Sequence, residues 1–385
     1  MNPTLPEPPA DAQSASLILQ NLIRNEIDKY DGWIPFSRFM ELALYAPVYG
    51  YYTGGSHKIG AAGDFITAPA LSPLFGQSLA KQINDLLPQT AGTVYEFGAG
   101  TGELAATLLP QLVNGGLQHY CIIEVSPELA ERQRQRIRQS VPEWADKVIH
   151  LTELPDTFDG IIIGNEVLDA MPCEVVRYGE NGFEQAGVSL NISDRHFEWG
   201  YRPLADSALL TTAAAYLPPL PGYTSELHPA QHAFVRTLAG KLVRGAIILI
   251  DYGFDAAQYY HPQRNQGTLI GHYRHHTVHD PFFYPGLTDL TAHVNFTDIA
   301  QAGTDGGLDL IGYATQANFL LNLGITDLLE ACGASDSTTY LREAAALHKL
   351  IGQHEMGELF KVIAFGRGVE VDWQGFTYGD ICHKL

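Results

Sequence analysis

Cysteine is scarce in this chain of 385 residues, which has only Cys121, Cys173, Cys332 and Cys382. The spacing of these residues matches neither a zinc site nor a paired redox motif. Cys121 falls within an apolar run that predicts a buried strand, where a small thiol packs as a core side chain. We therefore expect the protein to occupy a reducing compartment.

Basic residues are also few. The sequence has 23 Lys and Arg against 43 Asp and Glu, which gives a formal net charge of −20. This charge disfavours binding to the phosphate backbones of DNA and RNA and to anionic membranes. It favours a cationic partner, such as a protein segment that carries arginine or lysine.

Long apolar runs are missing as well. The longest plainly apolar run, residues 246–250, is far too short to cross a bilayer. Residues 1–13 are rich in proline and acidic, without the basic and apolar regions of a signal peptide. We therefore expect a soluble, cytoplasmic protein that does not insert into a membrane.

The most informative stretch combines an apolar run at 94–97, three alternating glycines (Gly98, Gly100 and Gly102) and leucines at helical spacing. Strand, glycine turn and helix begin a nucleotide-binding α/β unit, in which glycine lets the backbone pass close to a ligand. A plain tight turn is the alternative interpretation.

Two classes of ligand compete for this turn. The dinucleotide fingerprint needs a third glycine at position 103, where this chain has Glu103. The sequence instead reads E-x-G-x-G-x-G, with Glu96 inside the strand. That pattern resembles motif I of class I S-adenosylmethionine-dependent methyltransferases.

A second α/β unit follows. The apolar run 120–123 ends in Glu124, about 20 residues beyond the glycines, where a carboxylate can bind both ribose hydroxyls of a nicotinamide or adenosyl ligand. Ser126 and Pro127 then predict a helix N-cap and first helical position. The alternative for Glu124 is a solvated acid at a strand end.

Polar residues follow the strongest of the later strands. A weak third strand is predicted at 148–151 and a continuous apolar fourth strand at 160–164, as expected of buried parallel strands. The fourth strand leads into Asn165, Glu166 and Asp169, at the sheet edge where ligands bind in open α/β sheets. Glu166 and Asp169 are three residues apart, so on a helical turn they would share a face.

The chain is long enough for one large domain with insertions or for two domains. The patterns predict a disordered tail at 1–13 and a helical, lid-like region at 14–90. They predict the core at 91–172 and 245–370, where 245–253 is the fifth parallel strand. Residues 173–244 form an insertion, with a hairpin and a further strand, between the fourth and fifth strands.

Helical spacing predicts helices over 14–30 and 36–43, and Ser72-Pro73 begins another. Between them lie an aromatic turn at 45–52 and an irregular segment at 59–69. These two segments form either a lid over a ligand or a packed Ω-loop.

Two later stretches are predicted to be irregular. Residues 202–222 are dotted with proline, and 259–286 form a histidine-rich loop. The histidines at 272, 275, 276 and 279 lack the spacing of a zinc-binding helix, and Pro281 breaks the pattern. We therefore predict no metal site.

The sequence as a whole resembles the MidA-like methyltransferases, whose eukaryotic member is a mitochondrial protein-arginine methyltransferase that assists complex I assembly. The matching blocks lie in the family's order and span most of the chain: Gly50-Tyr51-Tyr52, Gly63 to Pro69, Glu96 to Gly102, Asn165-Glu166 with Leu168-Asp169-Ala170, Leu249 to Gly253, Asp289 to Val294, Met356-Gly357-Glu358 and Phe360-Lys361-Val362.

The resemblance implies an α/β fold: a class I (Rossmann-like) methyltransferase core with an N-terminal helical addition and an inserted β/α segment. It implies S-adenosylmethionine as cofactor and S-adenosylhomocysteine as product. The implied partner is a protein substrate, with a respiratory-complex subunit as the candidate, and the chain could form an oligomer. The implied cofactor contacts are Glu96, Gly98, Gly100, Gly102, Glu124, Asn165 and Glu166.

Two positions depart from the family pattern. Ala70 follows Thr67-Ala68-Pro69 where the family usually has glutamate, and Asn295 follows His293-Val294 where it usually has aspartate. If either acid normally handles substrate, these departures affect activity or substrate choice more than cofactor binding.

An arginine guanidinium is protonated at neutral pH and is therefore a poor nucleophile. Acids that bind its forked N–H groups would hold one nitrogen in line with the methyl group that is transferred. We predict that Glu166 does this, helped by Asp169 or Asp289, while Asn165 orients the cofactor end. For Glu166 and Asp169 the alternative is an acid that favours a helix N-terminus.

Three other functions compete with protein methylation. A cofactor-binding assembly protein with little or no turnover is the main rival, and Ala70 and Asn295 favour it. A nicotinamide oxidoreductase is disfavoured by Glu103. A nucleic-acid base methyltransferase would have Asn-Pro-Pro-aromatic where this chain has Asn165-Glu166-Val167.

Overall fold

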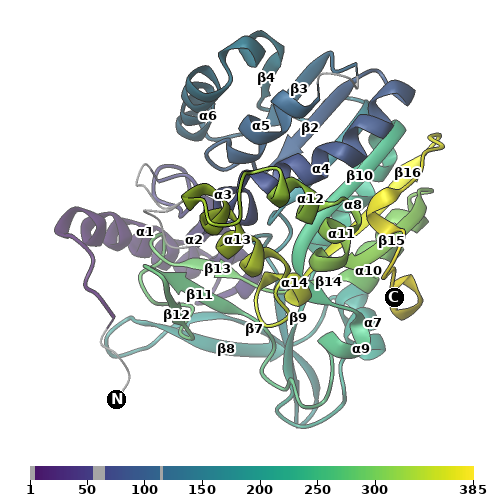
Figure 1. The fold of residues 1–385 in the computed structure, drawn as a ribbon. Coiled ribbons are helices and arrows are strands. Elements are labelled where there is room, and N and C mark those ends of the chain that lie inside the picture. The colour runs from purple at the N-terminus through teal and green to yellow at the C-terminus, as the bar shows by residue number, and fades with distance from the viewer. Residues whose placement is uncertain (1–4, 55–65, 113–115) are drawn as a thin grey trace. The chain divides into compact units, whose positions relative to one another are not determined.

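The computed structural model describes residues 5–54, 66–112 and 116–385 (Figure 1). The chain divides into two compact units. Unit 1 comprises Met1–Phe65, Leu168–His232 and Asp255–Asn295. Unit 2 comprises Ile66–Val167, Ala233–Phe254 and Phe296–Leu385.

Unit 2 is built on a mostly parallel sheet with the strand order β15-β16-β10-β5-β2-β3-β4. Strands β4, β3, β2, β5 and β10 are parallel, and β16 runs antiparallel to both β10 and β15. The strand bounds are β2 Thr93–Phe97, β3 His119–Ile123, β4 Val148–Leu151, β5 Phe158–Asn165, β10 Leu242–Phe254, β15 Asp309–Thr315 and β16 Phe360–Arg367.

The order of these strands fixes where a ligand can bind. The chain runs outward from β2 through β3 to β4 and then returns to β5 on the other side of β2. The carboxyl ends of β2 and β5 therefore flank a topological switch point, the position at which open α/β sheets bind their ligands.

Helices complete unit 2. Alternate residues of β5 and β10, such as Ile161, Ile163 and Ile248, share one buried core with the leucines of α4 and α5. On α8, Phe234 packs edge-to-face against Phe97 at a centroid distance of 5.2 Å. The helix bounds are α3 Ala68–Leu71, α4 Pro73–Leu86, α5 Glu103–Leu108, α6 Pro127–Ser140, α8 Pro229–Lys241, α10 Phe296–Asp305, α11 Gln316–Asn322, α12 Ile325–Glu330, α13 Thr338–Ile351 and α14 Met356–Leu359.

Unit 1 contains an antiparallel sheet in which β7 pairs with β1, β6 and β8, and β6 also pairs with β9. Helices α1 and α2 share its apolar core. A smaller sheet has the order β12-β11-β13. The bounds are α1 Ala10–Lys29, α2 Phe36–Tyr45, α7 Ser207–Tyr216, α9 Ala256–Tyr259, β1 Trp33–Pro35, β6 Glu174–Gly179, β7 Gly182–Leu190, β8 Phe197–Pro203, β9 Thr224–Leu227, β11 Ile270–Tyr273, β12 His276–Val278, β13 Asp289–Thr291 and β14 Val294–Asn295.

The five predicted parallel strands and the helices predicted at 14–30, 36–43 and after Ser72 are confirmed. The irregular stretch predicted at 202–222 is wrong, because α7 forms there. The Asp206 side chain caps this helix by accepting hydrogen bonds from the backbone N–H groups of Ala208 and Leu209. Alanine favours helix, and the flanking prolines concealed this signal.

The histidine-rich segment at 259–286 was predicted to be a loop, and this is also wrong in part. It contains the β11–β12 hairpin, whose two turn residues, Arg274 and His275, both have positive φ angles of 48° and 63°. Such a turn matches the twist of paired strands but is usually marked by Asn or Gly.

No helix among the described residues is both long and apolar enough to cross a membrane.

Candidate active site

The glycine turn after β2 has a backbone that ordinary side chains would strain. Gly98, Gly100 and Gly102 have φ angles of +65°, +53° and +87°, in the left-handed region that favours glycine. A Cβ atom on Gly98 would lie 2.8 Å from Cγ2 of Val167. The turn closes with a 2.8 Å hydrogen bond from the Gly102 N–H to the Ala99 carbonyl. It thus presents bare backbone at the switch point.

Glu124 follows β3, and both backbone and side-chain donors hold its carboxylate. Its Oε1 accepts from the backbone N–H of Ser126 at 2.8 Å, and its Oε2 accepts from Nε2 of Gln133 at 3.0 Å. Burial raises the pKa of Glu124, and these hydrogen bonds oppose that rise. A carboxylate has about four acceptor sites, so Glu124 keeps capacity for ligand hydroxyls.

Gln133 of α6 links the two predicted ligand-binding elements. Its side chain is fully buried, and Nε2 donates to the Gly100 carbonyl at 2.9 Å as well as to Glu124. Its Oε1 lies 3.1 Å from Nε2 of His150 on β4. One amide therefore fixes the glycine turn, the acid after β3 and the end of β4 relative to one another.

Gln133 was not predicted as a site residue, although the sequence holds a signal for it. Gln133 lies three residues after Ala130 and four before Ile137, and all three are buried. A glutamine in the apolar stripe of an amphipathic helix must satisfy its amide inside the protein, which marks it as a candidate positioning residue.

The structure separates Glu96 from the other predicted cofactor contacts. Its side chain is 2% exposed, and its Oε2 accepts a 2.7 Å hydrogen bond from the hydroxyl of Tyr120 on β3. Burial raises the pKa of Glu96 to about 7, while the bond from Tyr120 acts in the opposite direction. In this structure its carboxyl group joins β2 to β3 inside the core.

Asn165 and Glu166 lie at the end of β5, next to the glycine turn. Asn165 Nδ2 donates to Glu166 Oε1 at 3.0 Å, and the Glu166 N–H donates to the Ile250 carbonyl at 2.9 Å. Asn165 Oδ1 is buried and has no hydrogen-bond partner among the described residues. It is therefore an acceptor available to a ligand donor.

Glu166 has a φ angle of +54°. A non-glycine residue in this region costs of order 1–3 kcal/mol, and such strain clusters at functional sites. The expectation that Glu166 and Asp169 share a helical face is wrong, because residues 166–170 form bends and turns without helix. The left-handed conformation of Glu166 ends the strand without starting a helix.

Asp169 and Asp289, the other two predicted acids, come together in unit 1. Asp289 is 2% exposed, and its Oδ1 accepts from the Tyr52 hydroxyl at 2.9 Å. The Asp169 carbonyl accepts from the Ala292 N–H at 3.1 Å, next to β13. Burial first, then the charges of Asp289 and Asp169, raise the pKa of Tyr45. We call these two acids and two tyrosines the acid–tyrosine cluster.

The two tyrosines of this cluster were not predicted as site residues. Tyr45 and Tyr52 stack at a centroid distance of 5.5 Å and an interplanar angle of 24°, and the Tyr45 hydroxyl donates to the Ala170 carbonyl. The turns around Tyr51, which is 1% exposed, pack into the unit 1 core, as an Ω-loop would. Gly63, Asp64 and Phe65 of the adjoining segment lie outside the described residues.

Within the part of the chain that the structure describes, the two positions that depart from the family pattern, Asn295 and Ala70, show few contacts that bear on function. Asn295 is 1% exposed, and its Oδ1 has no partner among the described residues. Ala70 lies in α3. Within the described ranges, no three His, Cys, Asp or Glu side chains are grouped so that they could hold a metal ion.

Comparison with known proteins gives a family match. Residues 74–314 match a family described as "Putative S-adenosyl-L-methionine-dependent methyltransferase". The chain is 27% identical over 388 aligned residues to the mitochondrial protein arginine methyltransferase NDUFAF7 of Danio rerio, covering 90% of this chain and 87% of that protein. It is 26% identical to the Drosophila melanogaster homologue, covering 94% and 88%.

Two crystal structures of Burkholderia thailandensis proteins are similar along nearly the whole chain. One contains bound S-adenosyl-homocysteine; it is 47% identical, covers 99% of this chain and 100% of that one, and gives a TM-score of 0.95. The other is a native structure with the same identity and coverage and a TM-score of 0.93.

Proposed function

The chain belongs to this family of S-adenosyl-L-methionine-dependent methyltransferases, and on that premise we propose that it methylates a protein side chain, with arginine favoured. The predicted MidA-like membership and class I methyltransferase fold are confirmed. One observation carries the proposal: the glycine turn, Glu124, Asn165 and Glu166 all lie at the ends of parallel strands around one switch point.

The residues at the switch point fit an adenosyl cofactor. Glu124 is held in place by Gln133 and can accept both ribose hydroxyls. The buried Oδ1 of Asn165 can accept from an ammonium group of the cofactor. The glycine turn lets the amino-acid end approach the backbone. When bound, S-adenosylmethionine supplies an electrophilic methyl group on a sulfonium.

Arginine is the favoured substrate for two reasons. The NDUFAF7 relatives are named protein arginine methyltransferases. In addition, the acids of this chain suit a planar cation, and its net charge of −20 attracts one. We assign Glu166 the role of holding the guanidinium with one nitrogen in line, since its strained backbone fixes the carboxylate at the end of β5.

The acid–tyrosine cluster of unit 1 supports a cationic substrate independently. Two carboxylates and two stacked phenol rings attract a guanidinium through charge and through the faces of the rings. We propose that Asp169 and Asp289 attract the cationic side chain in this way. A respiratory-complex subunit, which the resemblance to the MidA-like methyltransferases implies, remains the candidate substrate, and cytoplasmic location remains a prediction.

The second candidate function is a cofactor-binding assembly protein with little turnover. It is favoured by Asn295, a buried amide where the family usually has an aspartate, and by Ala70. Loss of an acid at position 295 would weaken the handling of a cationic substrate while leaving the switch point intact.

Two measurements separate these functions. Calorimetry should show that the protein binds S-adenosylmethionine. Incubation with methyl-tritiated cofactor and cell lysate should then label protein, and amino-acid analysis of the labelled band should show methylarginine. Cofactor binding without labelled protein would favour the assembly role, and label on lysine alone would overturn the arginine assignment.

A further inference from the structure

Helix α6 carries four arginines, and they are neutralised unequally. Arg132 has its own partner, Glu128, at 2.5 Å. Arg136 likewise pairs with Glu103 at 2.8 Å. These two arginines are thus matched one to one.

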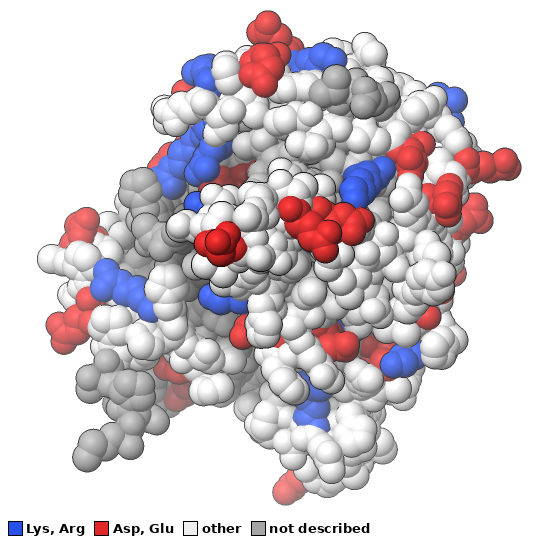
Figure 2. Space-filling view, viewed as in Figure 1, with Lys and Arg blue, Asp and Glu red and all other residues white. Residues whose placement is uncertain are grey.

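The other two arginines of α6 share a single acid. Arg134 lies 3.4 Å and Arg138 lies 3.7 Å from the carboxylate of Glu131. All three side chains are between 40% and 62% exposed, so these ion pairs are weak. Basic side chains gather at the upper left of the face in Figure 2, where Figure 1 places α6. Excess positive charge is unusual in a protein of net charge −20.

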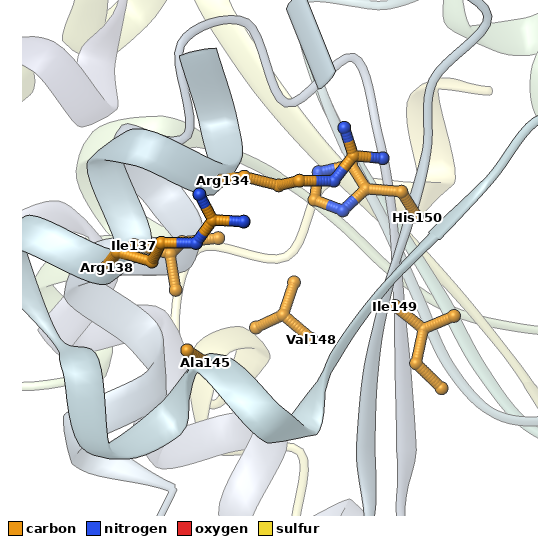
Figure 3. A pocket seen from close by; sticks show the side chains of 7 residues that line it. All are labelled: Arg134, Ile137, Arg138, Ala145, Val148, Ile149 and His150. Atoms are coloured by element: carbon orange, nitrogen blue, oxygen red, sulfur yellow. The ribbon is translucent and has the colours of Figure 1, made fainter. Parts of the chain in front are cut away.

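The two under-neutralised arginines line a cavity of about 400 Å³. Its walls come from α6, from the short 3₁₀ helix Pro142–Lys147 and from β4, the last strand of the sheet order (Figure 3). The lining residues, all within the described chain, are Arg134, Ile137, Arg138, Ala145, Val148, Ile149 and His150. They include two guanidinium groups, one imidazole and four apolar side chains, and no carboxylate.

The basic and apolar groups play different parts in this cavity. Figure 3 shows the Arg138 guanidinium beside α6, the Arg134 side chain extending from α6 toward the imidazole of His150, and the apolar side chains of Ala145 and Val148 below the two arginines. Burial first, and then the positive charge of Arg134, lower the pKa of His150 to about 4. The imidazole is therefore neutral at neutral pH, and the guanidinium groups supply the charge.

We propose that this cavity is a binding site for a small amphipathic anion, whose phosphate or carboxylate pairs with Arg134 and Arg138 while its apolar body packs against Ile137 and Val148. Guanidinium forks match carboxylate and phosphate oxygens in a bidentate manner. The volume falls within the range of small-molecule sites.

This site is distinct from the proposed cofactor site. Neither Glu124 nor the glycine turn lines the cavity. Nε2 of His150 is directed to Gln133, on the side that supports Glu124. The inference therefore stands whether or not the chain transfers methyl groups.

The test is calorimetric titration with phenyl phosphate, which combines a dianion with an apolar ring, carried out with and without saturating S-adenosylhomocysteine. We expect one saturable site per chain under both conditions. Inorganic phosphate and benzyl alcohol, which each lack one half of the probe, should bind at least fivefold more weakly.

Matched variants on one helix locate the site. Arg134→Gln and Arg138→Gln should each weaken phenyl phosphate binding at least fivefold, since each removes one charged partner. Arg132→Gln removes the same charge from the same helix outside the cavity and should change affinity less than twofold. Melting curves check that all three variants fold.

Any of four results would overturn the proposal. The first is the absence of saturable binding to the wild-type protein, and the second is an equal loss of affinity for phenyl phosphate in Arg132→Gln. The third is inorganic phosphate that binds as tightly as phenyl phosphate, and the fourth is displacement of phenyl phosphate by S-adenosylhomocysteine.

Discussion

Replacing Gln133 by leucine tests whether one buried amide organises the proposed cofactor site. Leucine fills a similar volume on the buried face of α6 but cannot donate to the Gly100 carbonyl or to Glu124. It also leaves His150 without its acceptor. The change therefore removes polar links while leaving the packing of the helix largely intact.

The size of the effect follows from the groups involved. The bond to the Glu124 carboxylate contributes about 1.5–3 kcal/mol, and each neutral bond contributes about 1 kcal/mol. Glu124 is only partly buried, so water recovers some of this loss. We expect a decrease of about 2 kcal/mol in the free energy of unfolding. A Glu124 carboxylate that Gln133 no longer holds should also lose about 1.4 kcal/mol of its interaction with the ribose hydroxyls, so the Kd for S-adenosylhomocysteine should rise about tenfold.

Calorimetry with S-adenosylhomocysteine and urea denaturation measure the two effects. The control is Gln135→Leu, the same substitution on the exposed side of the same helix, which should leave the Kd within twofold. A Gln133→Leu protein that is destabilised but binds the cofactor product as tightly as the wild type would refute the positioning role. An equal loss of affinity in both variants would refute it as well.

Three further predictions concern the ends of β2 and β5. Gly98→Ala should lower the free energy of unfolding by about 1–2 kcal/mol in urea denaturation, because the position has φ +65° and the new Cβ would meet Val167. The control is Gly240→Ala, at an uncrowded helical position of α8, which should leave the free energy of unfolding unchanged or raise it. Glu96 has its pKa raised from 4.5 to about 7, so its contribution to stability is complete below pH 4.5 and is lost as the pH rises through 7. Glu96→Gln should therefore flatten the decline in unfolding free energy between pH 5 and 8, an effect of at most about 3 kcal/mol, and an unchanged pH profile would contradict the assignment. Glu166→Gln should keep the Kd for S-adenosylhomocysteine within threefold of the wild-type value but slow methyl transfer at least 100-fold in a tritium-release assay. A variant that transfers methyl groups as fast as the wild type would exclude Glu166 from the chemistry.

Short sequence patterns predicted the elements of the fold whose structure is set by neighbouring residues. Alternating glycines after an apolar run predicted the turn at 98–102, and continuous apolar runs predicted the parallel strands. The position of α7 was missed because prolines on both sides of the segment outweighed the cap of Asp206 and the alanines. The two-residue turn of the β11–β12 hairpin was missed because Arg274 and His275 are not residues that usually mark such a turn.

The residues of the candidate site also fall into two groups, those that the local sequence predicts and those that depend on tertiary packing. Glu124, Asn165 and Glu166 could be predicted because each lies at or directly after the end of a strand that the sequence identifies. Gln133 and Tyr52 act through partners 33 and 237 residues away, Gly100 and Asp289. Contacts over such separations depend on how the elements pack, which neither periodicity nor spacing specifies.

Methyl transfer by this chain requires that an adenosyl cofactor lies across the switch point between β2 and β5. A crystal structure of this protein with S-adenosylhomocysteine tests it most directly. We expect the ribose hydroxyls to bind the Glu124 carboxylate, the amino-acid end to lie over the turn at 98–102, and the sulfur to face Glu166. A ligand bound elsewhere, or a sulfur directed away from Glu166, would contradict it.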